Sequence, residues 1–224
     1  MSLANAGHHR RLQHRLALAG LDALADYEIL ELVLGLAIRG RDTKPLARAL
    51  LKRFGSFGRV LDASEPDLVA VPGAGAAVAA AIRTVKAAGA AYLRDRSARN
   101  DALSSPALVA DYCRMRFAGN MVETFAALLL DSRNRVIETR VLSRGTVDRA
   151  AVFPREVAAA ALESHAASVI LTHNHPSGIP DPSPEDQRLT KDVKGALEML
   201  GMRLLDHVVV GHEGCFSFRE AGVL

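Results

Sequence analysis

Residues 172–193, THNHPSGIPDPSPEDQRLTKDV, constrain the local fold more than any other stretch of this chain. The apolar run ASVILT, which predicts a short buried strand, leads into it. Three prolines and a glycine follow within a few residues, so the chain must turn in a restricted loop. Ser183 is the expected N-cap of a helix that has Pro184 at its first position. The stretch therefore predicts a strand, a loop and a helix in close succession.

Three side chains in this stretch are of the kinds that bind metal ions. His173 and His175 lie two residues apart at the strand end, where alternate side chains point to the same side. Asp186 falls in the first turn of the helix, three residues after Ser183. Two imidazoles and one carboxylate are ligands that catalytic zinc prefers, with a fourth position left for water. The pattern alone is equally compatible with solvated histidines, an aspartate that interacts with the helix dipole, and a serine that only caps the helix.

The periodicity of the chain changes near residue 100. The region before it has apolar side chains at helical spacing and predicts an all-α domain over residues 1–100. The small polar stretch SARNDALSS then indicates a linker. In residues 101–224, apolar runs of strand length alternate with helices, which predicts an α/β domain and an α+β fold overall. The expected strands are residues 123–131, 135–143, 167–172, 203–211 and 215–218, and the expected helices are 106–117, 154–165 and 182–201.

Local signals divide the first half into separate helices. Asp26 and Thr43 are the expected N-caps of two of them, and Gly55 and Gly58 are expected to end the helix that Thr43 begins. The expected helices are residues 10–21, 25–38, 43–54, 64–71 and 75–96.

Composition indicates where such a chain resides. No apolar run approaches the ~18 residues that a membrane span requires, and the N-terminus lacks the apolar segment of a secretory signal. Two cysteines, Cys113 and Cys215, form no CxxC motif and predict reduced thiols. We therefore expect a cytoplasmic protein without a membrane partner.

Charge is distributed unevenly along the chain. Residues 1–100 contain 15 lysines and arginines against nine acidic residues, a balance of +6, whereas the remainder contains 13 against 16, a balance of −3. A basic half is typical of proteins that bind polyanions, but an excess of this size also occurs on ordinary solvated surfaces.

The basic half contains one glycine turn that could bind phosphate. SEPDLVAVPGAGAAVAAAIRTVKA predicts two helices joined at Gly73 and Gly75, and the second helix would begin with free backbone N–H groups. Arg83 and Lys86 follow one to two turns later. The arrangement resembles a helix-hairpin-helix, a module that contacts the DNA backbone without reading its sequence. It departs from the strongest examples because Ala74 stands where a larger apolar residue is common, and the alternative is a tight turn within a helical bundle.

The segment HNHPSGIPDPSPED resembles a known signature, H-x-H-P-x6-S-x-x-D, of the JAMM (MPN+) zinc isopeptidases. The fixed positions are filled by His173, His175, Pro176, Ser183 and Asp186. The wider context, which includes ETFAALLLDSRNRVIETRVLSRGTV, FPREV and LLDHVVVG, resembles the bacterial RadC family, and so do DYEILELVLG, KPLARALLKRFGS and LVAVPGAG in the helical half.

The resemblance implies an all-α helix-hairpin-helix domain followed by an α/β JAMM domain with a cytidine-deaminase-like fold. It implies one zinc ion held by His173, His175 and Asp186, and hydrolysis of an amide or isopeptide bond in a protein or peptide conjugate. It also supplies a glutamate as general base, which in this chain is Glu123. Ser183 would then donate a hydrogen bond to the developing oxyanion.

From physical reasoning alone, Glu123 ranks no higher than Glu138 or Glu156 as a catalytic base. His207, in LLDHVVVG, is either a neighbour of the metal site or an ordinary strand residue. His165 suits the C-terminal end of a helix, where a cation interacts favourably with the dipole.

Two functions from different classes remain open at this point. One is a zinc hydrolase of JAMM type, and the other is a DNA-associated protein whose helical half binds the DNA backbone while its zinc domain is regulatory or inactive. A zinc nucleobase deaminase is excluded, because the chain has no H-x-E together with P-C-x-x-C.

Overall fold

A computed structural model describes residues 3–99, 106–145, 152–212 and 214–224. The chain divides into two compact units, Met1–Ala88 and Gly89–Leu224, which we call the helical unit and the sheet unit. The division falls within the long helix α6 (Ala76–Arg99). The part of the predicted linker at residues 100–105 lies outside the described residues.

The helical unit is built around one apolar core. The core is formed by buried aliphatic side chains, among them Leu30, Leu34, Leu50, Leu68 and Ile82. The helices are α1 (Leu3–Ala19), α2 (Asp26–Ala37), α3 (Lys44–Phe54), α4 (Phe57–Asp62), α5 (Glu65–Val69) and the first part of α6, with a 3-10 turn η1 (Leu21–Ala23) after α1.

Two local predictions in the helical unit were wrong. The N-cap of α2 is Ala25 rather than Asp26, which instead lies in the first turn of the helix. Gly55 does end α3, in the left-handed conformation with a φ of 90°, but Gly58 lies inside the additional helix α4. Ser56 is the N-cap of α4, because its side chain accepts a hydrogen bond from the Arg59 amide. This helix is too short to show a clear helical periodicity in the sequence.

Helix α6 is long and apolar enough to cross a membrane by length and composition alone, over Ala76–Asp95. The segment contains no uninterrupted apolar run of that length, because Arg83 and Lys86 interrupt its alanines. Val78, Ala79 and Ile82 of this helix lie in the core of the helical unit. The core helix of a soluble protein passes the same test, so this segment is weak evidence for a span.

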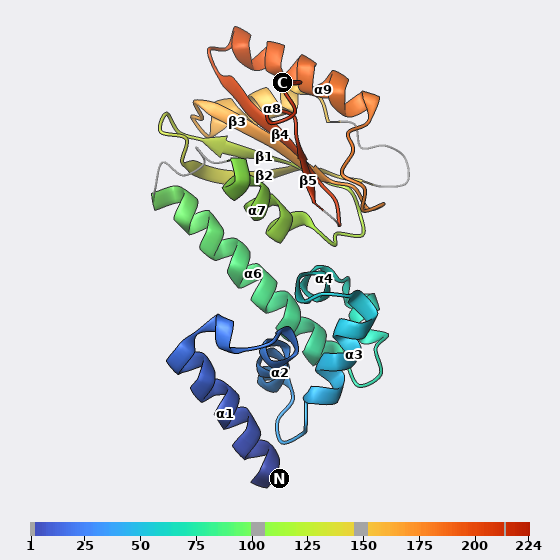
Figure 1. Cartoon of the computed structure of the whole chain (residues 1–224). Coiled ribbons are helices and arrows are strands. Elements are labelled where there is room, and N and C mark those ends of the chain that lie inside the picture. Colours follow the sequence, from blue (N-terminus) through green and yellow to red (C-terminus); the bar gives the residue numbers. More distant parts are fainter. Residues whose placement is uncertain (1–2, 100–105, 146–151, 213) are drawn as a thin grey trace. The chain divides into compact units, whose positions relative to one another are not determined.

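All five predicted strands are present, in a mixed sheet with the order β2-β1-β3-β4-β5 (Figure 1). The β1–β2, β1–β3 and β4–β5 pairs are antiparallel, and the β3–β4 pair is parallel. The strands are β1 (Thr124–Leu130), β2 (Val136–Arg144), β3 (Ser168–Asn174), β4 (Arg203–Val210) and β5 (Cys215–Ser217).

Helices cover both faces of the sheet, with α7 (Pro106–Phe117) on one face and α8 (Pro154–Glu163) and α9 (Pro184–Met199) on the other (Figure 1). Along β1, Phe125, Ala127 and Leu129 pack on the α8/α9 side, and the alternate residues pack on the α7 side. Because β1 is buried on both faces, it is a continuous apolar run in the sequence. The sheet unit is therefore a three-layer α/β/α sandwich, and the predictions of an α/β domain and of an α+β chain are confirmed.

Candidate metal centre

His173 lies near the end of β3, fully buried on the α8/α9 face. Phe125 of β1 is its partner across the antiparallel pair, and the two rings stack with centroids 5.4 Å apart. The strand continues through Asn174, two residues further than predicted. Because His175 follows directly, its side chain returns to the same face, and its Nε2 atom lies 3.0 Å from that of His173.

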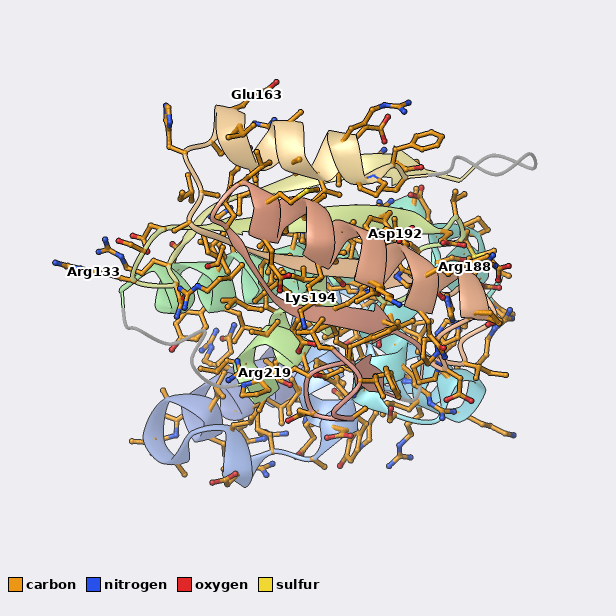
Figure 2. The ribbon with its side chains drawn as sticks, turned by 90° about the horizontal axis from the view of Figure 1, so that it is seen from above. Arg133, Glu163, Arg188, Asp192, Lys194 and Arg219 are labelled. Carbon is orange, nitrogen blue, oxygen red and sulfur yellow. The ribbon has the colours of Figure 1, made fainter. Side chains whose placement is uncertain are left out.

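Helix α9 brings the carboxylate to this pair. Its buried stripe consists of Asp186, Thr190, Val193 and Leu197, at helical spacing. The opposite face is charged, and Figure 2 shows Arg188, Asp192 and Lys194 on this helix, of which the first two are exposed. The first turn of the stripe thus carries the carboxylate, and the later turns anchor the helix in the core.

The N-terminus of α9 has the predicted cap. Ser183 is the N-cap and Asp186 is N3, and the Ser183 hydroxyl accepts the Asp186 amide at 3.1 Å. The Asp186 carboxylate in turn accepts the Ser183 amide at 2.7 Å and the Ser183 hydroxyl at 2.6 Å. This capping box fixes the orientation of the carboxylate.

The three predicted ligands converge on one point. Asp186 lies 3.3 Å from the Nε2 atom of His173 and 3.6 Å from the Nε2 atom of His175. The ligand atoms all lie within 4.8 Å of one another.

A chain of hydrogen bonds sets the tautomer of His173. The Thr190 hydroxyl donates to the Asp186 carbonyl at 2.6 Å, so at 2.7 Å it must accept from Nδ1–H of His207. Burial lowers the pKa of His207 well below its ordinary value, so this imidazole stays neutral and its Nε2 atom carries no proton. That atom accepts from Nδ1–H of His173 at 2.9 Å. The Nε2 atom of His173 is therefore left with a free lone pair that points at the other ligands.

His175 has the same tautomer for a different reason. Its Nδ1 atom lies 2.8 Å from the carbonyl oxygen of Ile179, which can only accept, so Nδ1 carries the proton. The loop that provides this carbonyl is braced, because the Gly178 carbonyl accepts the His212 amide at 2.8 Å. A side chain at Gly211 would collide with that same carbonyl, which accounts for glycine there.

Two unprotonated nitrogens and a carboxylate thus face one another, and only a cation can satisfy all three. When no metal is bound, a proton on Nε2 can take its place: burial favours a higher pKa for Asp186, but hydrogen bonds from the protonated forms of His173 and His175 and from Ser183 outweigh burial and hold the pKa far below its ordinary value. The hydrogen bond with Asp186 is the main cause that raises the pKa of His175. The donor set fits zinc, which binds neutral imidazole and carboxylate.

His207 reaches the site because of an irregularity in β4. Leu204 pairs with Val169, but the next residue of β3, Ile170, pairs with Asp206, so one residue of β4 is skipped. This bulge reverses the alternation, and His207 lies beside Leu171 on the α8/α9 face. Of the two alternatives that the sequence left open, the structure supports a neighbour of the metal site. Thr190 was not identified from the sequence as a residue of the site, although its position one helical turn after Asp186 is visible in the sequence.

Glu123 lies immediately before β1, and its side chain is exposed. When the β1–β3 register, in which Phe125 pairs with His173, is continued by two residues, Glu123 falls opposite His175. Its charge is among the causes that raise the pKa of His175, after the larger effect of the hydrogen bond with Asp186. The structure thus brings Glu123 to the same end of the sheet as the three ligands.

The predicted phosphate-binding residues lie at the turn between α5 and α6 and along α6. Gly73 adopts the left-handed conformation with a φ of 89°, whereas Gly75 has open space around it and does not. Lys86 forms an ion pair of 3.0 Å with Asp62, and both side chains are largely buried. Arg83 pairs with Glu65. The two cations are therefore engaged within the helical unit.

Comparison with known proteins agrees with this architecture. The RadC-like JAB domain matches residues 103–223. A UPF0758 protein of Rhodobacter capsulatus is 44% identical over 213 residues, which are 95% of this chain and 100% of that protein. UPF0758 proteins of Ruegeria pomeroyi and Aromatoleum aromaticum are 43% and 41% identical over 97% and 100% of this chain, and over 97% and 100% of their own lengths. The fold and the site thus define a JAB-type domain behind a helical region, and the chain belongs to the RadC family.

The hydrogen-bond chain behind His173 leads to a testable prediction. Replacing Thr190 with valine keeps the shape but leaves Nδ1–H of His207 without an acceptor, so His173 loses its fixed tautomer. We expect zinc affinity to fall about 10- to 100-fold, as is typical for lost partners of metal ligands. Competition against a chromophoric chelator measures this affinity. Thr190→Ser keeps the hydroxyl and should bind zinc like wild type, whereas equal loss in both variants would contradict the argument.

Proposed function

We propose that this protein is a zinc-dependent hydrolase of JAMM type that cleaves an amide or isopeptide bond in a protein or peptide conjugate. The observation that carries the proposal is the convergence of two unprotonated Nε2 atoms with the Asp186 carboxylate, beside an exposed glutamate. Three protein ligands leave a coordination position for water, which is typical of catalytic rather than structural zinc.

His173, His175 and Asp186 would hold the metal. Zinc, when bound there, lowers the pKa of its water to about 7 and polarises the scissile carbonyl group.

Glu123 is suited to move the proton of the reaction. Its carboxylate is exposed to an incoming substrate at the ligand end of the sheet. As general base it would accept a proton from the attacking water and pass it to the leaving amine. Water then adds across the C–N bond, which yields a carboxylic acid and a free amine.

Ser183 is suited to stabilise the developing oxyanion, although its hydroxyl already donates to Asp186 at 2.6 Å. To act as an oxyanion donor, the hydroxyl must turn from the carboxylate to the substrate. Its amide also donates to Asp186, at 2.7 Å, and can hold the carboxylate in place meanwhile.

The proposal is tested by labelling new amines. Zinc-loaded protein is incubated with a bacterial extract, and amines released by hydrolysis are tagged and identified by mass spectrometry. We expect a set of new amines that disappears when a chelator strips the metal and returns when zinc is restored. If the zinc-loaded and stripped samples release the same amines, the proposed function is wrong.

A second candidate function, binding of the DNA backbone, is favoured by one feature of the helical unit. Lys44 and Arg48 of α3 lie over the ring of Tyr27, at 5.4 and 5.1 Å from its centroid. Within the described part of the chain, neither cation forms an ion pair, in contrast to Arg83 and Lys86. Unpaired cations beside an aromatic ring are suited to phosphate contacts. In this second candidate function, the helical unit binds DNA and the zinc domain is regulatory or inactive.

Salt dependence tests this candidate. Replacing both Lys44 and Arg48 with glutamine should make the slope of log affinity against log salt shallower by about 0.9 for each lost phosphate contact on duplex DNA. Fluorescence anisotropy of a labelled duplex measures the slope. Arg83→Gln is the control, because Arg83 is already paired with Glu65. An unchanged slope in the double variant would exclude this surface.

For the cellular location we propose the cytoplasm, which is supported by Cys113 and Cys215, since they form no disulfide with each other.

A further inference from the structure

Asn174, the residue between the two histidine ligands, has its side chain on the opposite face of β3. Its neighbours His173 and His175 point toward the metal centre, so alternation directs Asn174 to the α7 side, where it is 2% exposed. A buried side-chain amide requires hydrogen-bond partners. The partners of the Asn174 side chain all belong to residues 120–124, which lie 50 to 54 residues earlier in the chain.

The orientation of the Asn174 amide follows from these partners. Its Oδ1 atom accepts the backbone N–H of Thr124 at 2.9 Å. Its Nδ2 group donates to the carbonyl oxygens of Asn120 at 3.1 Å and Val122 at 3.3 Å. An N–H can only donate and a carbonyl can only accept, so the amide cannot be reversed.

These hydrogen bonds enclose Glu123. The residue before it, Val122, and the residue after it, Thr124, are both attached to Asn174, and the Glu123 carbonyl accepts the Gly145 amide at 2.7 Å. In the described part of the chain, no side-chain hydrogen bond holds the exposed Glu123 carboxylate. The part of Glu123 that the fold holds is therefore its backbone, from which the side chain reaches toward the ligands.

We propose that Asn174 is a positioning residue, which ties the backbone of Glu123 to the strand that carries His173 and His175. The three-residue segment His-Asn-His then offers two metal ligands on one face of β3. From the other face, its asparagine sets the distance between the general base and these ligands. This inference rests on the proposed function. It accounts for the strand continuing through Asn174, because only an extended backbone points three successive side chains to alternating sides.

The experiment uses the full chain with two substitutions at this position. Asn174→Asp keeps the acceptor for Thr124 but turns the donor into an oxygen that faces two carbonyls, and Asn174→Ala removes all three bonds. On a substrate of the wild-type protein, we expect kcat to fall about 100-fold with KM and zinc content unchanged, since displacement of a catalytic group by about 1 Å has this effect. Thr172→Val is the matched control, because Thr172 is buried on the same face of β3 but its hydroxyl lies by the Cys113 thiol and forms no hydrogen bond with the described residues 120–124.

A double-mutant cycle separates positioning from general destabilisation. In a Glu123→Gln background, Asn174→Ala should have little further effect on kcat, because the group that it positions is already lost. Full additivity of the two losses, or wild-type kcat in both Asn174 variants, would overturn the inference.

Hydrogen exchange provides a readout that does not depend on activity. We expect amide protection in residues 120–124 to fall at least about tenfold in Asn174→Ala, while protection in β4 stays unchanged. If the wild-type protein hydrolyses no amide, the proposed function fails. Loss of protection confined to residues 120–124 would still support the role of Asn174 in tying this segment to β3. Unchanged protection there, or loss throughout the sheet, overturns it.

Discussion

Replacing His173 and His175 together with alanine is expected to reduce bound zinc from about one ion per chain to nearly none. The two Nε2 atoms lie 3.0 Å apart and carry free lone pairs, so the double variant keeps only Asp186 as a ligand. Inductively coupled plasma mass spectrometry of protein purified in zinc-containing buffer measures the metal content. The control is His14→Ala, which removes an exposed histidine of α1.

The same site predicts how zinc binding depends on pH. The hydrogen bond with Asp186 raises the pKa of His175. In metal-free protein the Nε2 atom of this imidazole, which lies next to Asp186, therefore stays protonated to a higher pH than usual. Zinc must displace this proton, and affinity should therefore fall as the pH decreases through the pKa of His175. Titrations at a series of pH values measure this dependence. Zinc content that survives the double substitution, or affinity that rises on acidification, would contradict the assigned ligands.

Replacing Glu123 with glutamine is expected to lower kcat by about 10²- to 10⁴-fold, while zinc content stays at the wild-type level. The substitution keeps the size of the side chain but removes its ability to accept and return a proton. Single-turnover kinetics on a substrate found by amine labelling, with metal analysis of the same sample, measures both quantities.

Two other glutamates provide controls for this prediction. Glu138, on the edge strand β2, accepts hydrogen bonds from Arg140 and from Ser164. Glu156 accepts a hydrogen bond from the Phe153 amide and so caps the start of α8. Physical reasoning from the sequence could not rank them below Glu123. Their glutamine variants should keep the wild-type kcat, and a comparable loss in either of them would remove the distinction that places the base at Glu123.

Much of the sheet unit was determined by local sequence alone. Strand periodicity and turn residues located all five strands, and β1 and β3 were evident because a strand buried on both faces is largely a continuous apolar run. The N-cap at Ser183 and the N3 position of Asp186 followed from local hydrogen-bonding chemistry, which needs no distant partner. The two-residue spacing of His173 and His175 likewise required only the alternation of an extended chain.

Other features depend on contacts between segments that are far apart in the sequence. The place of His207 depends on a bulge in β4, which a strict period of two would not include, and the bulge is visible only in the pairing with β3. Lys86 was a candidate phosphate-binding residue in the sequence, and in the fold it forms an ion pair with Asp62. Physical reasoning from the sequence did not separate Glu123 from other glutamates, whereas the β1–β3 register, continued by two residues beyond Phe125 and His173, puts it opposite His175. Register and pairing are set by the packing of whole elements, so only the tertiary structure decided that His207 and Glu123 lie near the three ligands that the sequence had predicted.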